Sequence, residues 1–253
     1  MTFANEPLLD QPMGFNVWRA PTDNDRKLKA DWYAAHYDHA ATNAYHTEYT
    51  VTASGVTLHT HVGIAAICVQ KFLDLDVTWT VANNGSVDLA LHAQRNTVFP
   101  ELPRFGLRLF LPQEMSQVNY YGMGPMECYR DKHHAASHSS YTATVWQLHE
   151  DYIRPQENGS HFDCDYVMLS GDAVRLTAVG TQPFSFNASH YTQEELTRKA
   201  HNYELEPCGS TVLCLDYAQN GIGSESCGPR LLEQYRLDDA TFNFGLRLFP
   251  EKK

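Results

Sequence analysis

Leu73-Asp74-Leu75-Asp76-Val77-Thr78-Trp79-Thr80-Val81 is the stretch that decides the fold, because apolar and polar residues alternate along its whole length. Asn83-Asn84-Gly85-Ser86 follows, and Asn-Gly is a favoured pair for a tight turn since both residues tolerate positive φ. The alternation then returns, with apolar residues at Val87, Leu89, Leu91 and Ala93. A period of two places one face of a strand in the core and the other in water. We therefore predict an antiparallel hairpin closed at Asn84-Gly85.

The same alternation recurs in short segments that are separated by turn formers such as Ser170-Gly171-Asp172. The further predicted strands are Val56–Val62, Phe105–Leu111, Val118–Tyr121, Tyr141–Trp146, Tyr166–Leu169, Val174–Val179, Phe184–Phe186, Val212–Leu215 and Phe242–Phe249. Short strands divided by turns are typical of antiparallel sheets and not of βαβ units. Helical spacing is confined to Asp25–His39 and to Thr192–Ala200, which opens with a capping box of Thr192 and Glu195. The predicted fold class is all-β, a large antiparallel β-sandwich with minor helices.

Residues 1–253 are predicted to form a single domain, because no low-complexity stretch or Pro/Gly/Ser-rich linker divides them. The six cysteines have no CxxC pair and no regular spacing, which argues against a zinc cage and a secreted disulfide framework. No basic leader follows Met1, and no apolar run approaches the ~20 residues of a membrane span. We therefore expect a cytoplasmic protein. A net charge of −11 disfavours nucleic acid or an anionic membrane as a partner.

Several catalytic signatures are absent from the sequence, namely GxSxG, HExxH, the P-loop and GxGxxG. Gly122-Met123-Gly124 and Gly221-Ile222-Gly223 lack the third glycine of a dinucleotide loop, so we predict that both are turns. His133, His134 and His138 are clustered, but no carboxylate stands at ligand spacing, which favours a solvated loop over a metal site.

Hydrolysis of a glycoside by acid–base catalysis needs two carboxylates roughly 5–10 Å apart. The candidates on this chain are Glu127, Asp131, Glu157, Asp163 and Asp165. Among thirty carboxylates such a pair is easily assembled by chance, so we interpret these residues as ion-pair and turn partners. No catalytic residue and no metal ligand is predicted on this chain.

Four segments combine turn formers, aromatic residues and charges. They are Trp18-Arg19-Ala20-Pro21-Thr22-Asp23-Asn24-Asp25, Tyr121-Gly122-Met123-Gly124-Pro125-Met126-Glu127-Cys128-Tyr129-Arg130-Asp131-Lys132, Arg154-Pro155-Gln156-Glu157-Asn158-Gly159 and Gly221-Ile222-Gly223-Ser224-Glu225-Ser226-Cys227-Gly228-Pro229. Such loops can hold sugar hydroxyls with amide and carboxylate groups beside an aromatic face. Alternatively, Arg19 and the Asp23–Asp25 run support loops at the rim of the sandwich. The residues alone leave both interpretations open.

In their order and spacing these segments, together with Phe184–Thr192, resemble the C-terminal β-sandwich domain of family 2 β-galactosidases, the lactase family. In some lactic-acid bacteria this domain is a separate small chain. The resemblance runs from about Leu9 to Phe249. Two residues depart from the family pattern in the second segment, Cys128 in place of Asn and Lys132 in place of Arg. The family domain also usually starts with one or two further strands before the position of Met1.

The resemblance implies a supersandwich similar to that of galactose mutarotases. It further implies a non-catalytic domain or small subunit that completes the galactose pocket of a partner catalytic barrel or large chain in a retaining β-galactosidase. The catalytic glutamates and the magnesium of such a glycoside hydrolase lie on the barrel, so no cofactor is expected on this chain. Family members carry Trp or Cys in the last loop, where this chain has Cys227. The substrate-binding candidates are Cys227, Ser226 and Glu225, with Arg104 and Gly106 of a neighbouring strand-loop at Arg104–Arg108.

Two alternatives belong to other functional classes. One is a free-standing carbohydrate-binding or lectin-like sandwich. The other is an independent aldose mutarotase, which would need a histidine and a glutamate as an acid–base pair in a concave groove. His92, His149 and Glu157 are too weakly constrained by the sequence to be assigned such roles.

Overall fold

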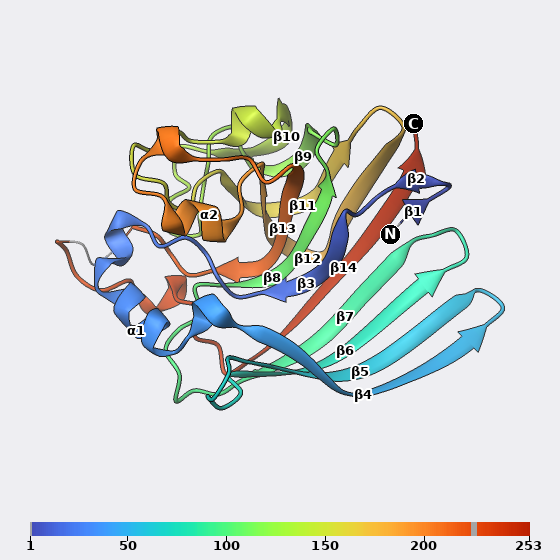
Figure 1. Ribbon diagram of the computed structural model, residues 1–253, viewed down its shortest axis with the longest axis horizontal. Helices are drawn as coiled ribbons and strands as arrows, with labels where there is room; N and C mark the ends of the chain where they lie inside the picture. The colour runs from blue at the N-terminus through green and yellow to red at the C-terminus, as the bar shows by residue number, and fades with distance from the viewer. Residues whose placement is uncertain (1, 224–226) are drawn as a thin grey trace.

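The computed structural model describes residues 2–223 and 227–253. Strands account for 51% and helices for 12% of the chain. The predicted all-β sandwich with minor helices is therefore confirmed, and Figure 1 shows the strands as two facing, strongly curved layers.

One antiparallel sheet contains twelve strands of the described part of the chain. Nine strands follow one another across it, in the order β10 (Ser137–Thr144), β9 (Gln117–Gly124), β11 (Ser160–Ser170), β12 (Val174–Ser189), β14 (Thr241–Lys252), β7 (Val87–Arg95), β6 (Leu73–Ala82), β5 (Gly55–Ala65) and β4 (Ala41–Thr52). A branch leaves this path through β13 (Ser210–Gln219), β8 (Arg104–Pro112) and β3 (Gln11–Asn16). The short strands β1 (Thr2–Phe3) and β2 (Glu6–Pro7) pair only with each other.

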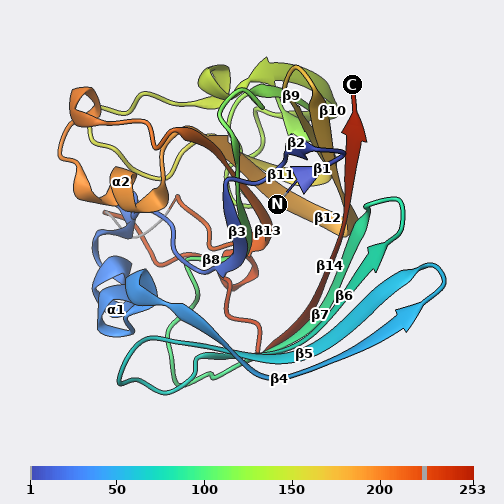
Figure 2. The same ribbon diagram turned by 45° about the vertical axis from the view of Figure 1, so that its right-hand side comes forward.

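The branch begins at the long strand β12, which changes its partner halfway along. Its first half, Val174–Gly180, pairs with β14, whereas its last residues, Ser185–Ser189, pair with β13. The sheet therefore divides into two layers, and the β3–β8–β13 layer faces the β14–β7–β6 layer across the core (Figure 2). Phe105 of β8 contacts Phe242 of β14 edge to face, with 5.0 Å between the ring centroids. The sandwich is thus one continuous sheet that folds back at β12.

The hairpin predicted from the opening alternation is confirmed as β6 and β7, with Val81 opposite Val87. Its turn differs in detail from a two-residue Asn-Gly turn. The amide of Gly85 donates to Ala82 O at 2.9 Å, and Gly85 has a φ of 86° while Asn84 does not have positive φ. This is a longer loop in which only the glycine adopts the left-handed conformation, which glycine enters without a steric cost.

Most of the other predicted strands are confirmed, and four strands of the described residues, β1 to β4, were missed. Val174–Val179 and Phe184–Phe186 are parts of the single strand β12. The segment predicted at Tyr141–Trp146 begins earlier, as β10, and continues into a 3₁₀ turn at Val145–Leu148. β3 and β4 were not predicted. Tyr49 and Val51 of β4 alternate with polar residues, but the strand is exposed at every residue and is held by its ladder with β5.

The predicted helix at Asp25–His39 is divided into three pieces. They are a 3₁₀ turn at Asp23–Arg26, helix α1 at Leu28–Ala34 and a 3₁₀ turn at Tyr37–His39. His36 has a φ of 58°, a left-handed conformation that ends α1. The second predicted helix is α2 (Gln193–Arg198), with short 3₁₀ turns at Asn202–Glu204 and Glu233–Tyr235 further along. None of the helices in the described residues is long and apolar enough to cross a membrane.

The N-cap of α2 is Thr192, whose Oγ accepts from the amide of Glu195 at 3.1 Å. The other half of the predicted capping box is not formed. The Glu195 carboxylate instead contacts Arg198 and Lys199 and accepts from the amide of Glu206. The ion pairs with Arg198 and Lys199 thus replace the hydrogen bond that the Thr192 amide would donate to the Glu195 carboxylate.

Candidate functional site

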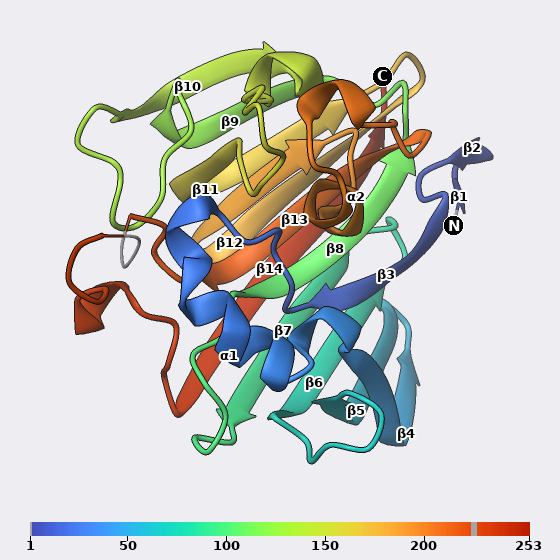
Figure 3. The ribbon, with the colours of Figure 1, turned by 60° about the vertical axis from the view of Figure 1, so that its left-hand side comes forward.

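The four segments singled out in the sequence meet at one end of the sandwich. Figure 3 shows α1, the loop after β9 and the loop after β13 gathered at this end. Hydrogen bonds connect the segments in a closed ring: Asn24 Nδ2 to Ile222 O at 2.9 Å, the amide of Gly223 to Asp131 at 2.8 Å, the amide of Gly159 to Glu127 at 2.9 Å, and the amide of Glu157 to Ala20 O at 3.0 Å. Each segment is thereby held by two of the others. The ring joins the described parts of the four segments into a single platform.

Arg19 is the centre of the first segment and has no exposed surface. Its Nη2 lies 2.8 Å from Asp25 Oδ1 and 3.2 Å from Gly221 O, and its Nη1 donates to Asn220 O. Asp25 in turn accepts from the amide and the hydroxyl of Thr22. These contacts support the interpretation that Arg19 and Asp25 hold loops, since Asp25 and both terminal nitrogens of Arg19 have partners inside the protein, whereas the buried Arg19 Nε has none among the described residues.

Asp131 holds the loop from the other side. Its two carboxylate oxygens accept from the amides of Ile222 and Gly223 at 3.1 and 2.8 Å. A Cβ on Gly221 would lie 2.8 Å from the Asp131 carboxyl carbon, so a side chain at this position would collide with it. Gly221-Ile222-Gly223 is therefore a turn, as predicted, and Gly221 permits the carboxylate to approach the backbone.

The prediction of a turn at Gly122-Met123-Gly124 is wrong, because these residues end strand β9. A Cβ on Gly122 would lie 2.3 Å from Cys164 Sγ, and one on Gly124 would lie 2.2 Å from the Tyr120 hydroxyl. The glycines are needed here because neighbouring side chains cross over the strand. A glycine pair can mark close packing as well as a turn.

Glu127 ties the second segment to the third. Its carboxylate accepts from Lys132 Nζ at 2.8 Å, from the Tyr152 hydroxyl at 2.5 Å and from the amide of Gly159 at 2.9 Å. Burial by itself raises the pKa of Glu127, but the hydrogen bonds from Lys132, Tyr152 and Gly159 outweigh it and lower the pKa below the usual value. Glu127 is therefore an ionised structural group and is poorly suited to be a general acid.

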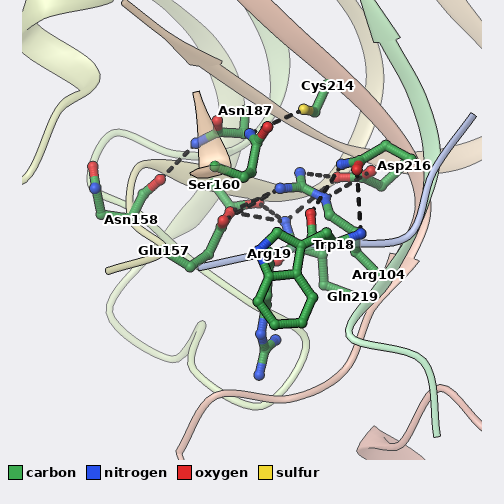
Figure 4. A network of polar contacts seen from close by, with 12 residues as sticks. Trp18, Arg19, Arg104, Glu157, Asn158, Ser160, Asn187, Cys214, Asp216 and Gln219 are labelled. Atoms are coloured by element: carbon green, nitrogen blue, oxygen red, sulfur yellow. Dashed lines mark hydrogen bonds and ion pairs between the residues drawn. The ribbon is translucent and has the colours of Figure 1, made fainter. Parts of the chain in front are cut away.

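Arg104 lies at the floor of the site, between two carboxylates (Figure 4). Its Nη2 is 2.5 Å from Asp216 Oδ2, its Nη1 is 3.3 Å from Glu157, and all three side chains are buried. Burial lowers the pKa of Arg104, but the adjacent Asp216 and Glu157 raise it well above the usual value. Burial raises the pKa of both carboxyl groups despite the guanidinium. The carboxyl groups thus share one cation in a water-free position.

Asp216 and Gln219 were missed by the sequence analysis. Gln219 Nε2 donates to Ser160 Oγ at 3.0 Å and also lies near Glu157 and Asp216, so it completes the network. One signal was available. Asp216 is a lone charge after the apolar run Val212-Leu213-Cys214-Leu215, and a charge in a buried strand needs a buried partner.

The predicted substrate-binding residues fall into two groups. Arg104 and Gly106 belong to the regular strand β8 and not to a strand-loop, which corrects that prediction. The Arg104 guanidinium has no exposed surface, and a Cβ on Gly106 would lie 2.2 Å from Leu215 O, so the structure does not support direct sugar contact by either. Cys227 is exposed in the loop beyond the platform. Ser226 and Glu225 lie outside the described residues, and sugar contact by this loop stays a prediction.

The clustered histidines and the remaining carboxylates take part in separate local contacts. The His133 and His134 rings lie 5.0 Å apart, and the described residues contain no group of three metal-ligating side chains. Asp165 forms an ion pair with His138 near the surface, at 3.3 Å. His92 contacts Asn243 on the exposed side of β7, whereas Glu157 is buried in the Arg104 network. The structure therefore gives no support for a His92–Glu157 acid–base pair.

Acid should destabilise the fold through His161, whose Nδ1 lies 3.1 Å from the Tyr120 hydroxyl and 3.2 Å from Met123 O. Burial lowers the pKa of His161 from 6.5 to about 4. The unfolded chain then binds a proton that the folded chain rejects, so the stability from this histidine is complete above pH 6.5 and is lost as the pH falls toward 4. A shift of this size corresponds to about 3 kcal/mol.

Urea unfolding at pH 7 and pH 4.5 measures this effect. We expect the free energy of unfolding to fall by about 2–3 kcal/mol more in the wild type than in His161→Gln, because the variant cannot take up that proton. His138→Gln, on a partly exposed histidine, is the matched control and should behave like the wild type. An equal pH dependence of the wild type and His161→Gln would show that His161 titrates normally.

The fold, an antiparallel β-sandwich with four joined segments at one end, belongs to the all-β class that the sequence predicted. The family model described as the β-galactosidase small chain matches residues 1–248. The chain therefore belongs to the β-galactosidase small-chain family, as its resemblance predicted.

Curated relatives agree with this membership. The chain is 44% identical over 249 residues to a β-galactosidase of Actinobacillus pleuropneumoniae and 38% identical over 244 residues to one of Staphylococcus xylosus. The alignments cover 98% and 96% of this chain but 24% of each relative, so the chain spans about a quarter of their length.

Among solved structures, the galactose 1-epimerase of Lactobacillus acidophilus aligns with a TM-score of 0.42 and 10% identity, over 81% of this chain and 66% of that one. A galactose mutarotase-like protein of Lactobacillus casei aligns with the same TM-score and 13% identity, over 83% and 74%. Scores of this size do not support a conclusion about function.

Proposed function

We propose that this chain is the non-catalytic C-terminal domain or small subunit of a cytoplasmic, retaining β-galactosidase. In this role it completes the galactose pocket of a partner catalytic portion. The observation that carries the proposal is the closed ring of hydrogen bonds, which joins at one end of the sandwich the four segments that resemble the family pattern. Family membership supplies the reaction, since the relatives are named β-galactosidases.

The chemistry divides between the two portions in this proposal. Double displacement needs a nucleophile carboxylate and an acid–base carboxylate about 5–5.5 Å apart in a retaining enzyme. The buried carboxylates among the described residues are each paired with an arginine or lysine, as Asp25 is with Arg19, Glu157 with Arg104 and Glu127 with Lys132. We therefore assign the catalytic glutamates, and a magnesium ion, to the partner portion. This chain contributes the wall that orients the sugar and excludes water.

An exposed apolar strip supports a large partner. Tyr49 of β4, Leu58 of β5 and Trp79 of β6 are directly opposite one another and lie in line with the core residue Leu89. Val51, Val56 and Val81 form the next row, in line with Val87. Tyr49 is 71% and Val51 is 67% exposed. The inner face of the sheet thus continues as an apolar surface beyond its covering layer, which is typical of an interface.

Co-purification tests this interface and the proposed partnership. The partner probe is the A. pleuropneumoniae β-galactosidase with the region matching this chain deleted. We expect a stable complex with the wild-type chain and binding at least tenfold weaker with Tyr49→Lys or Val51→Lys, because a charge on the strip would be buried. Thr50→Lys, on the opposite face of the same strand, should bind normally. No complex with the wild-type chain would count against the proposal and for a free-standing sugar-binding sandwich.

Asp131→Ala should impair the assembled enzyme without unfolding this chain. The variant removes two hydrogen bonds from a charged acceptor, each worth about 1.5–3 kcal/mol. The 221–227 loop then loses one side of its support, so we expect KM for a chromogenic β-galactoside to rise about tenfold or more. Asp165→Ala, which removes a surface carboxylate, should leave KM unchanged. An unchanged KM in Asp131→Ala would show that the loop does not shape the sugar site.

A further inference from the structure

The free edge of strand β4 is a main-chain hydrogen-bonding surface that the proposed function does not use. Among the described strands β4 pairs only with β5, and all twelve of its residues are exposed. Figures 1 and 2 both show β4 as the outermost strand of its layer, with no described segment along its free side. An edge strand of this length is a template for pairing with another strand unless its sequence protects it.

Natural edge strands are commonly protected by lysine, by proline or by a bulge. β4 contains neither lysine nor proline. Its register shift lies between Ala44 and His46, so the bulge interrupts only the first part of the strand. From His46 to Thr52 the pairing with β5 is regular. This regular segment, His46–Thr52, is called the open edge below.

The turn that joins β4 to β5 determines which main-chain groups of the open edge point outward. Only two residues separate Thr52 from Gly55, its opposite residue, so Thr52 and Gly55 exchange the hydrogen bonds that close the turn. Bonded and non-bonded pairs alternate along an antiparallel ladder. Thr47, Tyr49 and Val51 therefore direct their N–H and C=O groups away from β5. No turn or loop contact between described residues satisfies these groups.

We propose that the open edge pairs with the open edge of a second copy of this chain, antiparallel, about a two-fold axis at Tyr49. Tyr49 then lies opposite Tyr49 of the second copy, and Thr47 lies opposite Val51. Every outward group of these residues is satisfied, through about six main-chain hydrogen bonds. The two sheets become one continuous sheet. This inference goes beyond the proposed function, since it needs no catalytic portion.

The charges on β4 favour this register. A two-fold contact needs a surface that is complementary to itself. With the axis at Tyr49, Glu48 lies opposite the neutral Thr50 of the second copy. An axis at Glu48 would place two carboxylates directly opposite each other, which is destabilising. An axis at Thr50 would shorten the pairing to Glu48–Thr52.

The apolar strip supports a second copy as the occupant. The proposed axis is perpendicular to the sheet, so the inner faces of both copies stay on the same side. The row of Tyr49, Leu58 and Trp79 in one copy then continues directly into the same row of the other. Tyr49 is 71% exposed in the single chain, and contact with its symmetry mate covers part of this apolar surface.

Sedimentation equilibrium of the chain alone tests the pairing, at about 0.15 M salt to screen the net charge of −11 on each copy. We expect a monomer–dimer equilibrium with a dissociation constant on the order of 10 µM. Thr47→Pro removes an outward N–H and should weaken the dimer at least tenfold, whereas proline is tolerated on an edge where that N–H faces solvent. Thr47→Val retains the N–H and is the matched control, with wild-type dimerisation.

A charge exchange tests the register. Thr50→Glu places a glutamate opposite Glu48 at two symmetric positions, so we expect the dimer to weaken about tenfold. The double variant Glu48→Thr/Thr50→Glu has the net charge of the wild type and again places each glutamate opposite a threonine. It should dimerise within about twofold of the wild type. Both residues are exposed, so these substitutions leave the core intact.

Three outcomes would overturn the proposal. The first is a chain that stays monomeric at about 500 µM, far above the expected dissociation constant. The second is a double variant that dimerises no better than Thr50→Glu, which would reject the register. The third is hydrogen-exchange protection of the outward β4 amides only after the truncated A. pleuropneumoniae enzyme is added, which would assign the open edge to the catalytic portion. The first two outcomes leave the proposed partnership with that portion intact.

Discussion

Adding this chain to a β-galactosidase that lacks the matching region should restore hydrolysis of a chromogenic β-galactoside. The truncated A. pleuropneumoniae enzyme alone, and this chain alone, should each show background activity only. Among the described residues, the buried carboxylates Glu127, Glu157 and Asp216 are held by Lys132 and Arg104, so these three offer no free pair. The truncated enzyme would lack the wall that orients the sugar and excludes water, and misplacement of about 1 Å already costs roughly 100-fold in rate.

We therefore expect the rate of hydrolysis to rise about 100-fold or more when the two are mixed. The rate should reach a plateau as the concentration of this chain increases. The matched control is the Tyr49→Lys variant, which retains the platform but carries a charge on the apolar strip. It should restore activity only at a higher concentration than the wild type needs, because the substitution weakens its binding to the truncated enzyme. Inhibitor-sensitive hydrolysis by the pure isolated chain would contradict the assignment of both catalytic groups to the partner portion. Binding without restored activity would refute the proposed role in the galactose pocket while leaving the partnership intact.

Arg104→Met should cost about 3–5 kcal/mol in the free energy of unfolding, because it leaves Asp216 and Glu157 buried without their shared cation. A domain of this kind is stable by only about 5–15 kcal/mol, so the variant should unfold at much lower urea concentration. Arg108→Met is the matched control on the same strand. Arg108 pairs with the half-exposed Glu194 at 2.8 Å, and such surface pairs contribute about 0–1 kcal/mol.

The pH dependence gives a second readout for the Arg104 network. Burial raises the pKa of both Asp216 and Glu157, so acid neutralises them more readily than exposed carboxyl groups. The difference in stability between the wild type and Arg104→Met should therefore shrink from pH 7 to pH 5, because the uncompensated charge disappears. Equal losses in Arg104→Met and Arg108→Met, or a difference independent of pH, would show that the network is not a buried ion cluster.

The alternation of apolar and polar residues predicted most of the strands, because a strand with one buried face has an apolar residue at every second position. β6 and β7 show this most clearly, and β8, β13 and β14 follow the same rule. β4 was missed because both of its faces are exposed in this chain, so neither face is buried, and its position depends on pairing with β5. The sequence also did not predict that Val174–Val179 and Phe184–Phe186 belong to one strand. Gly180 and Pro183 suggest in the sequence that a strand ends there, whereas β12 continues through both residues while it changes its partner strand.

The sequence by itself determined that this is an antiparallel β-sandwich of the β-galactosidase small-chain family. It also identified the four segments that combine turn formers, aromatic residues and charges. Only the tertiary structure decided that these segments form one ring and that Arg104 is buried between Asp216 and Glu157. It also revealed Asp216 as the partner of Arg104, 112 positions away along the chain. The physical reason is that alternation and turn chemistry act between near neighbours. The pairing of buried charges depends on which distant strands the fold brings into contact.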